Sequence, residues 1–330
     1  MPVQLADHIE HLSATSLTQF YRCPQQWAYR RLHNLKEPPG SALLVGNGYH
    51  DALEANFLQK IVTMKDLPPK ACEDAFHEAF EAEVEKAGGS GEIAWKVGEP
   101  RGDRGIEVLR QTGLGLTKVY RKQQAPYVLP FAVEEWFDIE PCGFPLTGRI
   151  DIEGELLNGD GPQHPPWKEA DTCRACGAEL DPPRVPRGLC AFCAGDKLID
   201  HKTASQARIQ PDAKIQVGVY QLHRPLPAEL HVAVKTKTPK MLIEALPVAP
   251  AARTERWISN MIATIEDYMR RFGTGCSVCL SSSDCSVCGS TPWPGVGQRD
   301  SWACNYCGYG PKGTDRCPWW KEEPWRTSLF

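Results

Sequence analysis

The sequence lacks the long apolar runs and leader features that place proteins in or beyond a membrane. No stretch of eighteen or more apolar residues occurs in the 330 residues, so we expect no transmembrane helix. The opening Met-Pro-Val-Gln-Leu-Ala-Asp-His contains neither a basic segment nor an apolar one, and we expect no signal peptide. These two absences predict a cytoplasmic protein with no membrane partner.

The sequence also has no excess of positive charge and no nucleotide-binding loop. Its formal net charge is −4, whereas proteins that bind nucleic acid usually present a basic surface. Local clusters can still supply one. One basic cluster consists of Arg22, Arg30, Arg31 and Lys36, and another of Arg270 and Arg271. The missing Gly-x-x-x-x-Gly-Lys-Ser/Thr segment excludes a helicase motor in this sequence. Any helicase that acts with the protein would therefore be a separate polypeptide.

Hydrophobic periodicity divides the chain into a helical first part and a later part with alternating segments. The predicted helices are 13–35, 43–57, 70–86, 103–122, 212–223 and 254–272, with Ser13 or Ser16 as the first N-cap. The predicted strands are 131–139, 146–153, 197–202, 231–235 and 240–247. This order predicts an α/β fold, with a helical region over 1–127 and a core domain over 128–272.

Cysteine pairs interrupt the core and predict an inserted metal site over 156–195. The pairs are Cys173 with Cys176 and Cys190 with Cys193, separated by thirteen residues. In a reducing compartment such pairs favour metal sites over disulfides. Four thiolates at this spacing are typical of a tetrahedral zinc ribbon. The insertion is expected to stabilise a long loop or to clamp a substrate or partner.

A second group of cysteines lies in the last segment, 273–330, which is too poor in periodic apolar residues to bury an ordinary core. We expect bound metal to hold it. Its cysteines are Cys276, Cys279, Cys285, Cys288, Cys304, Cys307 and Cys317. Together with Cys23 they would supply two four-ligand sites. Cys72 and Cys142 stand apart and are expected to be buried small hydrophobic residues.

Two carboxylates and a lysine fall on adjacent predicted strands. Asp151 ends a short alternating strand and Asp200 lies on the neighbouring apolar strand, so both carboxylates can point into one cleft. Carboxylates and phosphate oxygens together suit Mg²⁺ or Mn²⁺. Lys202 lies two residues after Asp200, on the same strand face. There it could orient or activate a water and neutralise charge in the transition state. The set predicts hydrolysis of a phosphodiester.

A predicted helix adds Gln216 and Tyr220. The two residues are four apart, so they share one helix face. Both side chains could hydrogen-bond a scissile phosphate or orient Lys202. The alternative is a tyrosine of the hydrophobic core beside a solvated glutamine.

Five segments in order carry a resemblance to a known family. They are Ser16-Leu-Thr-Gln-Phe-Tyr-Arg-Cys23-Pro-Gln-Gln-Trp, Gly46-Asn-Gly-Tyr-His50, Gly148-Arg-Ile-Asp151, Asp200-His-Lys202-Thr and Gln216-Val-Gly-Val-Tyr220. The chain resembles the RecB-type branch of the PD-(D/E)XK nucleases, and within it the iron–sulfur nucleases of CRISPR adaptation and their phage-encoded relatives. The resemblance implies a restriction-endonuclease-like core, a mixed sheet flanked by helices. It also implies a metal-dependent DNA exonuclease that acts on single strands or ends in CRISPR adaptation, recombination or repair.

The resemblance also implies roles for individual residues. His50 would join Asp151 and Asp200 as a metal ligand, and the backbone carbonyl of His201 would be a further ligand. Glu134, favoured over Glu135 by motif register, would be an outer carboxylate. The expected catalytic residues are therefore His50, Asp151, Asp200, Lys202, Gln216 and Tyr220.

For the cysteines, the resemblance implies a [4Fe–4S] cluster that ties Cys23 to three cysteines of the last segment. One partition, which we favour, gives the cluster Cys23, Cys276, Cys279 and Cys317, and gives zinc Cys285, Cys288, Cys304 and Cys307. The other gives the cluster Cys23, Cys276, Cys279 and Cys285, and gives zinc Cys288, Cys304, Cys307 and Cys317. Binding of zinc alone is a third possibility.

A different class of function also fits the sequence. The chain could be a non-cleaving DNA-binding or adaptor module that uses zinc ribbons to recruit partners. Under either hypothesis the expected partners are DNA and, beyond it, recombination, CRISPR-adaptation or helicase proteins.

Overall fold

The computed structural model describes residues 4–96, 98–156 and 195–272. Two of the predicted metal regions fall outside these ranges. Neither the four cysteines of the predicted insertion, Cys173 to Cys193, nor the seven of the last segment, Cys276 to Cys317, are among the described residues.

The described residues form helices and strands in the predicted order. The helices are α1 (Ala14–Arg22), α2 (Pro24–Arg31), α3 (Ser41–Thr63), α4 (Pro69–Lys86), α5 (Gly102–Gln123), α7 (Pro211–His223) and α8 (Ala251–Phe272). The strands are β1 (Val128–Ile139), β2 (Leu146–Leu156), β3 (Lys197–Ala204), β4 (Ala228–Val234) and β5 (Lys240–Leu246). The described residues also form short 3-10 helices, among them Pro141–Gly143 between β1 and β2.

The five strands form one mixed sheet in the order β1-β2-β3-β4-β5. β3 and β4 run parallel, and the other neighbouring pairs are antiparallel. The parallel pair needs a crossover connection, which α7 provides. The predicted α/β class with a mixed sheet flanked by helices is therefore confirmed.

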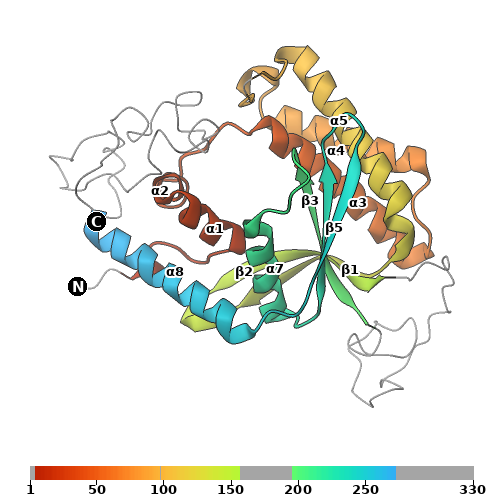
Figure 1. The fold of residues 1–330 in the computed structure, drawn as a ribbon. Coiled ribbons are helices and arrows are strands. Elements are labelled where there is room, and N and C mark those ends of the chain that lie inside the picture. Colours follow the sequence, from red (N-terminus) through yellow and green to blue (C-terminus); the bar gives the residue numbers. More distant parts are fainter. Residues whose placement is uncertain (1–3, 97, 157–194, 273–330) are drawn as a thin grey trace.

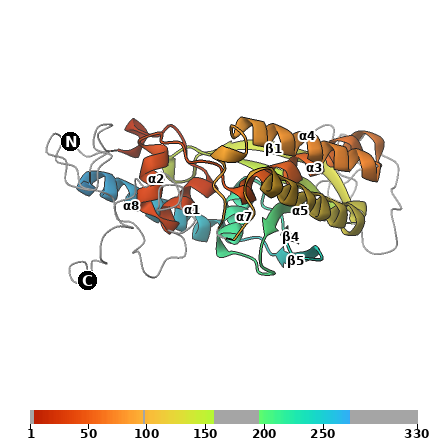
Figure 2. The same ribbon diagram turned by 90° about the horizontal axis from the view of Figure 1, so that it is seen from above.

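Helices cover the sheet in two groups with separate hydrophobic clusters. One cluster joins α3, α4 and α5 to the sheet and includes Phe57 and Phe76. The other joins α1, α2, α7 and α8 and includes Trp27 and Ile258. In both views α3, α4 and α5 lie toward one end of the molecule and α1, α2 and α8 toward the other (Figures 1 and 2). Because the sheet lies between the two groups, side chains of both α3 and α7 can contact its strands.

The predicted helix 13–35 is wrong as a single element. It is two helices that meet at Cys23, whose φ of −156° and ψ of 99° are extended. The cause is Pro24, because a proline disfavours helical angles in the residue before it and is tolerated as the first residue of a new helix. Of the two predicted N-caps, Ser13 is the one used, since its side chain accepts a hydrogen bond from the Ser16 backbone N–H at 3.1 Å.

The two isolated cysteines differ from each other. Cys72 is buried as expected, and its Sγ lies 3.8 Å from the Ala52 carbonyl oxygen. Cys142 is exposed, which corrects the expectation that it is a buried residue. It lies in the Pro141–Gly143 turn with a left-handed φ of 61°, and tight turns of this kind stand at the protein surface.

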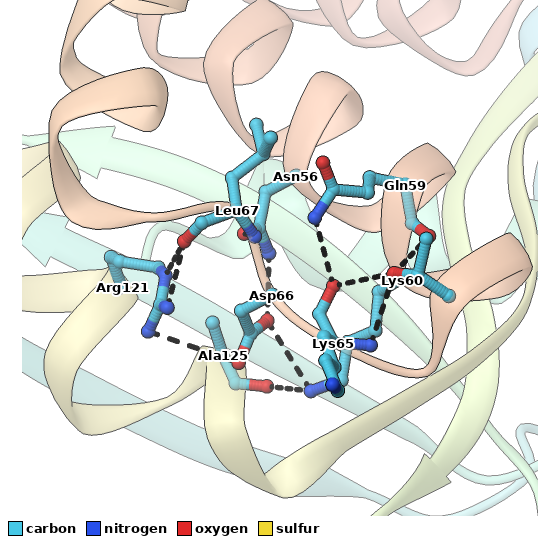
Figure 3. A network of polar contacts seen from close by, with 9 residues as sticks. Asn56, Gln59, Lys60, Lys65, Asp66, Leu67, Arg121 and Ala125 are labelled. Atoms are coloured by element: carbon cyan, nitrogen blue, oxygen red, sulfur yellow. Dashed lines mark hydrogen bonds and ion pairs between the residues drawn. The ribbon is translucent and has the colours of Figure 1, made fainter.

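A buried polar network joins the end of α3 to the end of α5 (Figure 3). Lys60 is only 2% exposed, and its Nζ donates to the Ala125 carbonyl at 2.6 Å and pairs with Asp66 at 3.3 Å. Asn56 donates to the same carboxylate at 3.0 Å, and Arg121 donates to the Leu67 carbonyl. The buried ammonium therefore ties together two helices and the loop that follows α3.

We predict that Lys60→Met destabilises the protein by about 3 kcal/mol, the low end of the cost of breaking a buried ion pair. The cost stays low because Asp66 keeps the hydrogen bond from Asn56 and an ion pair with Arg121 at 3.8 Å. The matched control is Lys65→Met in the same loop, where the side chain is exposed and the change should stay within about 0.5 kcal/mol. Urea unfolding measures both. Equal midpoints for the two variants would show that the network adds no stability.

Candidate active site

The candidate site lies where β2 and β3 separate. These strands pair through Ile152 with Ile199, Glu153 with Leu198 and Gly154 with Lys197, and the ladder then ends. The next residues in the same register are Asp151 and Asp200. Instead of a ladder bond, the Asp151 Oδ2 atom accepts a hydrogen bond from the His201 backbone N–H at 2.6 Å. The fork therefore brings the two predicted metal-binding carboxylates to the same point of the sheet.

Both carboxylates are buried, and one of them has a free oxygen. Asp151 is 8% exposed and Asp200 is 1% exposed. The Asp200 Oδ1 atom accepts from Lys202 Nζ at 2.6 Å, whereas Oδ2 has no hydrogen-bond partner among the described residues. A buried unpartnered carboxylate oxygen is costly and calls for an ion or water. The donor set therefore fits a hard divalent cation.

Burial also changes how these groups ionise. It raises the pKa of Asp200 to about 6, with Lys202 opposing and Asp151 reinforcing the rise. Burial likewise raises the pKa of Asp151, against the effect of Lys202 and of the hydrogen bond from His201. Burial alone would lower the pKa of Lys202, but the carboxylates of Asp200 and Asp151 outweigh it and the net shift is upward. Lys202 is thus a cation that neutralises this pair only in part.

α3 brings His50 to the same carboxylate. Its Nδ1 lies 3.6 Å from Asp151 Oδ2, and partial burial together with Lys202 lowers the pKa of His50 to about 4. At neutral pH the imidazole is therefore uncharged and able to bind a metal. Gly48 lets α3 approach α4, since a Cβ there would lie 3.2 Å from the Phe76 ring. Ligand atoms of His50, Asp151 and His201 lie within 4.8 Å of one another, close enough to bind one metal ion, and Asp200 is not part of this group.

α7 contributes Gln216 and Tyr220 from the other helix group. The Gln216 side-chain amide donates to the Tyr220 hydroxyl. Tyr220 is 3% exposed, and burial, followed by the charges of Asp200 and Asp151, raises its pKa well above the usual value. The tyrosine packs against Phe137, so it serves the core and also faces the carboxylates.

Glu134 on β1 completes the acidic group. By the β1–β2 register it stands opposite Asp151, and its φ of 52° is left-handed, which is strained for a non-glycine residue and concentrates at functional sites. Its Oε2 lies 2.5 Å from Arg149 Nε. Burial and the Asp151 charge raise the pKa of Glu134 to about 8. Glu135 instead pairs with Arg224 at 3.1 Å.

Some residues around the site were not predicted from the sequence, and one candidate lies apart. Arg149 pairs with Glu134 of β1. It lies two residues before Asp151 inside the Gly148–Asp151 motif, and this position in the motif could have identified it. Tyr120 and His231 carry no local signal, because only the fold brings them to His201. Cys23 lies at the α1–α2 junction, 8% exposed, and its expected cluster partners are outside the described residues.

Comparison with protein families finds a family model that matches part of the chain. A family model described as the PD-(D/E)XK nuclease superfamily matches residues 11–164. The match includes His50, Glu134 and Asp151 and ends before Asp200 and Lys202. It supports a PD-(D/E)XK nuclease superfamily domain, and with it a nuclease, a hydrolase of phosphodiesters.

Two solved structures show limited similarity. A crystal structure described as "Putative exonuclease" from Eubacterium rectale is 12% identical, covers 82% of this chain and 85% of its own, and has a TM-score of 0.41. The crystal structure of SSO0001 is 11% identical, covers 74% of this chain and 88% of its own, and has a TM-score of 0.26. Similarities this low carry no argument about fold or function. No curated protein matches the chain.

Within the described residues, none of the helices combines the length and the apolar character that a membrane crossing requires.

We predict that Mn²⁺ binding depends on pH through Asp200. Its pKa of about 6 in the metal-free protein means that a proton competes with the cation below that value. Affinity should therefore rise as the pH increases to about 6 and then level off. Calorimetric titration with Mn²⁺ on both sides of this pH measures the change, and Asp200→Asn should bind weakly at either pH. Equal wild-type affinities below and above it would contradict the placement of Asp200 at the metal.

Proposed function

We propose that this protein is a metal-dependent DNA exonuclease that acts on single strands or ends. The observation that carries the proposal is the buried, unpartnered oxygen of Asp200 at a strand fork shared with Asp151, beside the ammonium of Lys202. A Mg²⁺ or Mn²⁺ ion held by Asp151, Asp200 and His50, with the His201 carbonyl as a further ligand, would polarise the phosphate and acidify a water.

In this proposal the protein's own groups position the reacting atoms. Lys202, kept cationic by the two carboxylates, holds the attacking water and offsets charge on the phosphate as it becomes pentavalent. The Gln216 amide and the Tyr220 hydroxyl, already joined by a hydrogen bond, align the phosphate from α7. The low exposure of Asp200 and Tyr220 limits bulk water and strengthens each of these electrostatic contacts.

We predict that Lys202→Ala reduces Mn²⁺-dependent cleavage of labelled single-stranded DNA by at least roughly 10²–10³-fold, the usual cost of removing one transition-state donor. DNA binding should persist. The matched control is Lys118→Ala on α5, where the side chain is more than half exposed in a surface ion pair with Glu73. A wild-type protein that binds DNA and cleaves no faster than Lys202→Ala would favour the non-cleaving adaptor function instead.

An exposed aromatic residue beside the site supports DNA as the substrate. Trp136 is 71% exposed and pairs across the β1–β2 ladder with Arg149, whose guanidinium carbon lies 5.7 Å from the indole centroid. Arg149 also contacts Glu134. An aromatic face with an adjacent cation is the usual surface for stacking a base and holding a phosphate. We propose that a single strand enters the site over Trp136.

We predict that Trp136→Ala weakens binding of single-stranded DNA by about 5- to 150-fold, the equivalent of about 1–3 kcal/mol for one base–aromatic stack. Tyr21→Ala is the control, because Tyr21 is similarly exposed at 67% but lies on α1. Fluorescence anisotropy of a labelled oligonucleotide, measured with the Asp200→Asn variant to prevent cleavage, reports both. Equal losses in the two variants would place the strand elsewhere.

We further propose that the cysteines hold a [4Fe–4S] cluster and zinc, with Cys23, Cys276, Cys279 and Cys317 at the cluster. One described feature supports the link between the chain ends: Phe20, three residues before Cys23, packs edge-on against Tyr268 near the end of α8 with 5.4 Å between ring centroids. α8 ends four residues after Tyr268, on the side of the molecule that carries Cys23. Closing a loop of roughly 250 residues would offset considerable chain entropy.

Metal analysis with a visible spectrum tests the cysteine proposal. We predict a brown protein with about four irons and one or two zincs, a count set by the Cys₄ ligand sets. Cys23→Ser should lose the iron and keep the zinc, whereas Cys142→Ser, an exposed isolated cysteine, should keep both. Zinc without iron in the wild-type protein would remove the cluster and leave the nuclease site untouched.

The biological setting follows from the resemblance alone. We propose a cytoplasmic role in CRISPR adaptation, recombination or repair, where a nuclease without its own motor would act beside other recombination, CRISPR-adaptation or helicase proteins.

A further inference from the structure

A buried chain of hydrogen bonds runs behind the candidate metal site. Lys197 Nζ donates to Glu229 Oε1 at 2.7 Å, and Glu229 Oε2 lies 3.2 Å from His231 Nε2. His231 Nδ1 lies 3.0 Å from the Tyr120 hydroxyl, which lies 2.7 Å from His201 Nε2. Tyr120, His201 and His231 are at most 2% exposed. The chain therefore leads from a partly exposed ion pair to the ring of His201.

The Glu229 carboxylate determines which atom donates each hydrogen bond in this series. Glu229, paired with Lys197, is a carboxylate and can only accept, so His231 Nε2 must carry the hydrogen. In a neutral imidazole Nδ1 then has the lone pair, and it accepts the Tyr120 O–H. Since the hydroxyl has a single hydrogen, its oxygen accepts from His201, and the His201 hydrogen is on Nε2. His201 Nδ1 is left with a lone pair.

That lone pair faces the candidate metal site. His201 Nδ1 lies 3.8 Å from Asp151 Oδ2, and His50 Nδ1 lies 3.6 Å from the same oxygen. Two atoms bound to one ion at about 2.1 Å each lie up to about 4.2 Å apart, so one ion can bridge each of these pairs. The 3.8 Å separation is too long for a hydrogen bond, so Nδ1 has no competing partner in Asp151.

Packing holds the His201 ring in this orientation. The Phe57 ring stacks on it with 6.1 Å between centroids and an interplanar angle of 7°, and the Tyr120 ring meets its edge at 4.9 Å. Rotation of the imidazole would break both contacts as well as the hydrogen bond to Tyr120. Ligating histidines commonly have such an outer partner for the second ring nitrogen, which sets the tautomer and the ring plane.

We propose that the Glu229–His231–Tyr120 chain fixes His201 as the Nε2–H tautomer and makes its side-chain Nδ1 a metal ligand together with His50 and Asp151. The inference rests on the metal site of the proposed function and adds to it an imidazole that the resemblance does not assign. Two imidazoles beside a carboxylate favour Mn²⁺ and other transition metals over Mg²⁺, which prefers oxygen ligands. Tyr120 and His231 are then positioning residues.

The tautomer can be measured without metal and without substrate. Long-range ¹H–¹⁵N correlation spectra of the metal-free, ¹⁵N-histidine-labelled protein distinguish a protonated ring nitrogen from an unprotonated one, and His201→Gln identifies the signal. We expect Nε2 protonated and Nδ1 unprotonated. The reverse tautomer would overturn the proposal. Because this readout involves no cleavage, it stands even if the protein proves not to be a nuclease.

Metal affinity provides the second test, with a closely matched control. Tyr120→Phe removes the hydroxyl from the chain, whereas Tyr49→Phe removes a hydroxyl that is equally buried in the same aromatic cluster but has no hydrogen-bond partner among the described residues. By electron paramagnetic resonance titration with Mn²⁺, Tyr120→Phe should bind about 10- to 100-fold more weakly and Tyr49→Phe should match the wild type. Equal affinities for the two variants would overturn the proposal.

Discussion

The structure depends on two buried carboxylates that meet where a β-ladder stops. Asp151 and Asp200 are the next pair in the β2–β3 register after the last bonded pair, so the backbone gives up a ladder bond to bring two like charges together. The ammonium of Lys202 balances only part of that charge. Burying two carboxylates side by side costs free energy, and a bound cation offsets that cost. The helices on each side supply the other groups, His50 from α3 and Tyr220 from α7.

The Lys60 network differs from the Asp200 site in how its charged groups are paired. Near Lys60 every charged group has a partner, and the network joins α3, α5 and their loops. Around Asp200 one oxygen has none within the described residues, and Glu134 adopts a strained left-handed φ. We therefore expect the first region to add stability and the second to reduce it, which is the usual division between scaffold and functional site.

Much of the site could be predicted from local sequence patterns. The rest could not be predicted, for physical reasons. Period-two alternation placed Asp200 and Lys202 on one strand face, and helical spacing placed Gln216 with Tyr220. The break at Cys23 was missed because the apolar pattern continues across Pro24. The tautomer of His201 could not be predicted, because Tyr120 and His231 come from α5 and β4 and only tertiary packing joins them. The roles of the site residues stay predictions, supported by the geometry and by the superfamily match.

The most direct test of the account is anomalous diffraction from crystals of the whole protein soaked in Mn²⁺. The account predicts one strong manganese peak at the β2–β3 fork, bound by carboxylate oxygens of both Asp151 and Asp200, with imidazole nitrogen from His50 and His201. A soaked crystal with no peak there, or with the two carboxylates turned away from each other, would contradict the central claim that this fork exists to hold a metal ion.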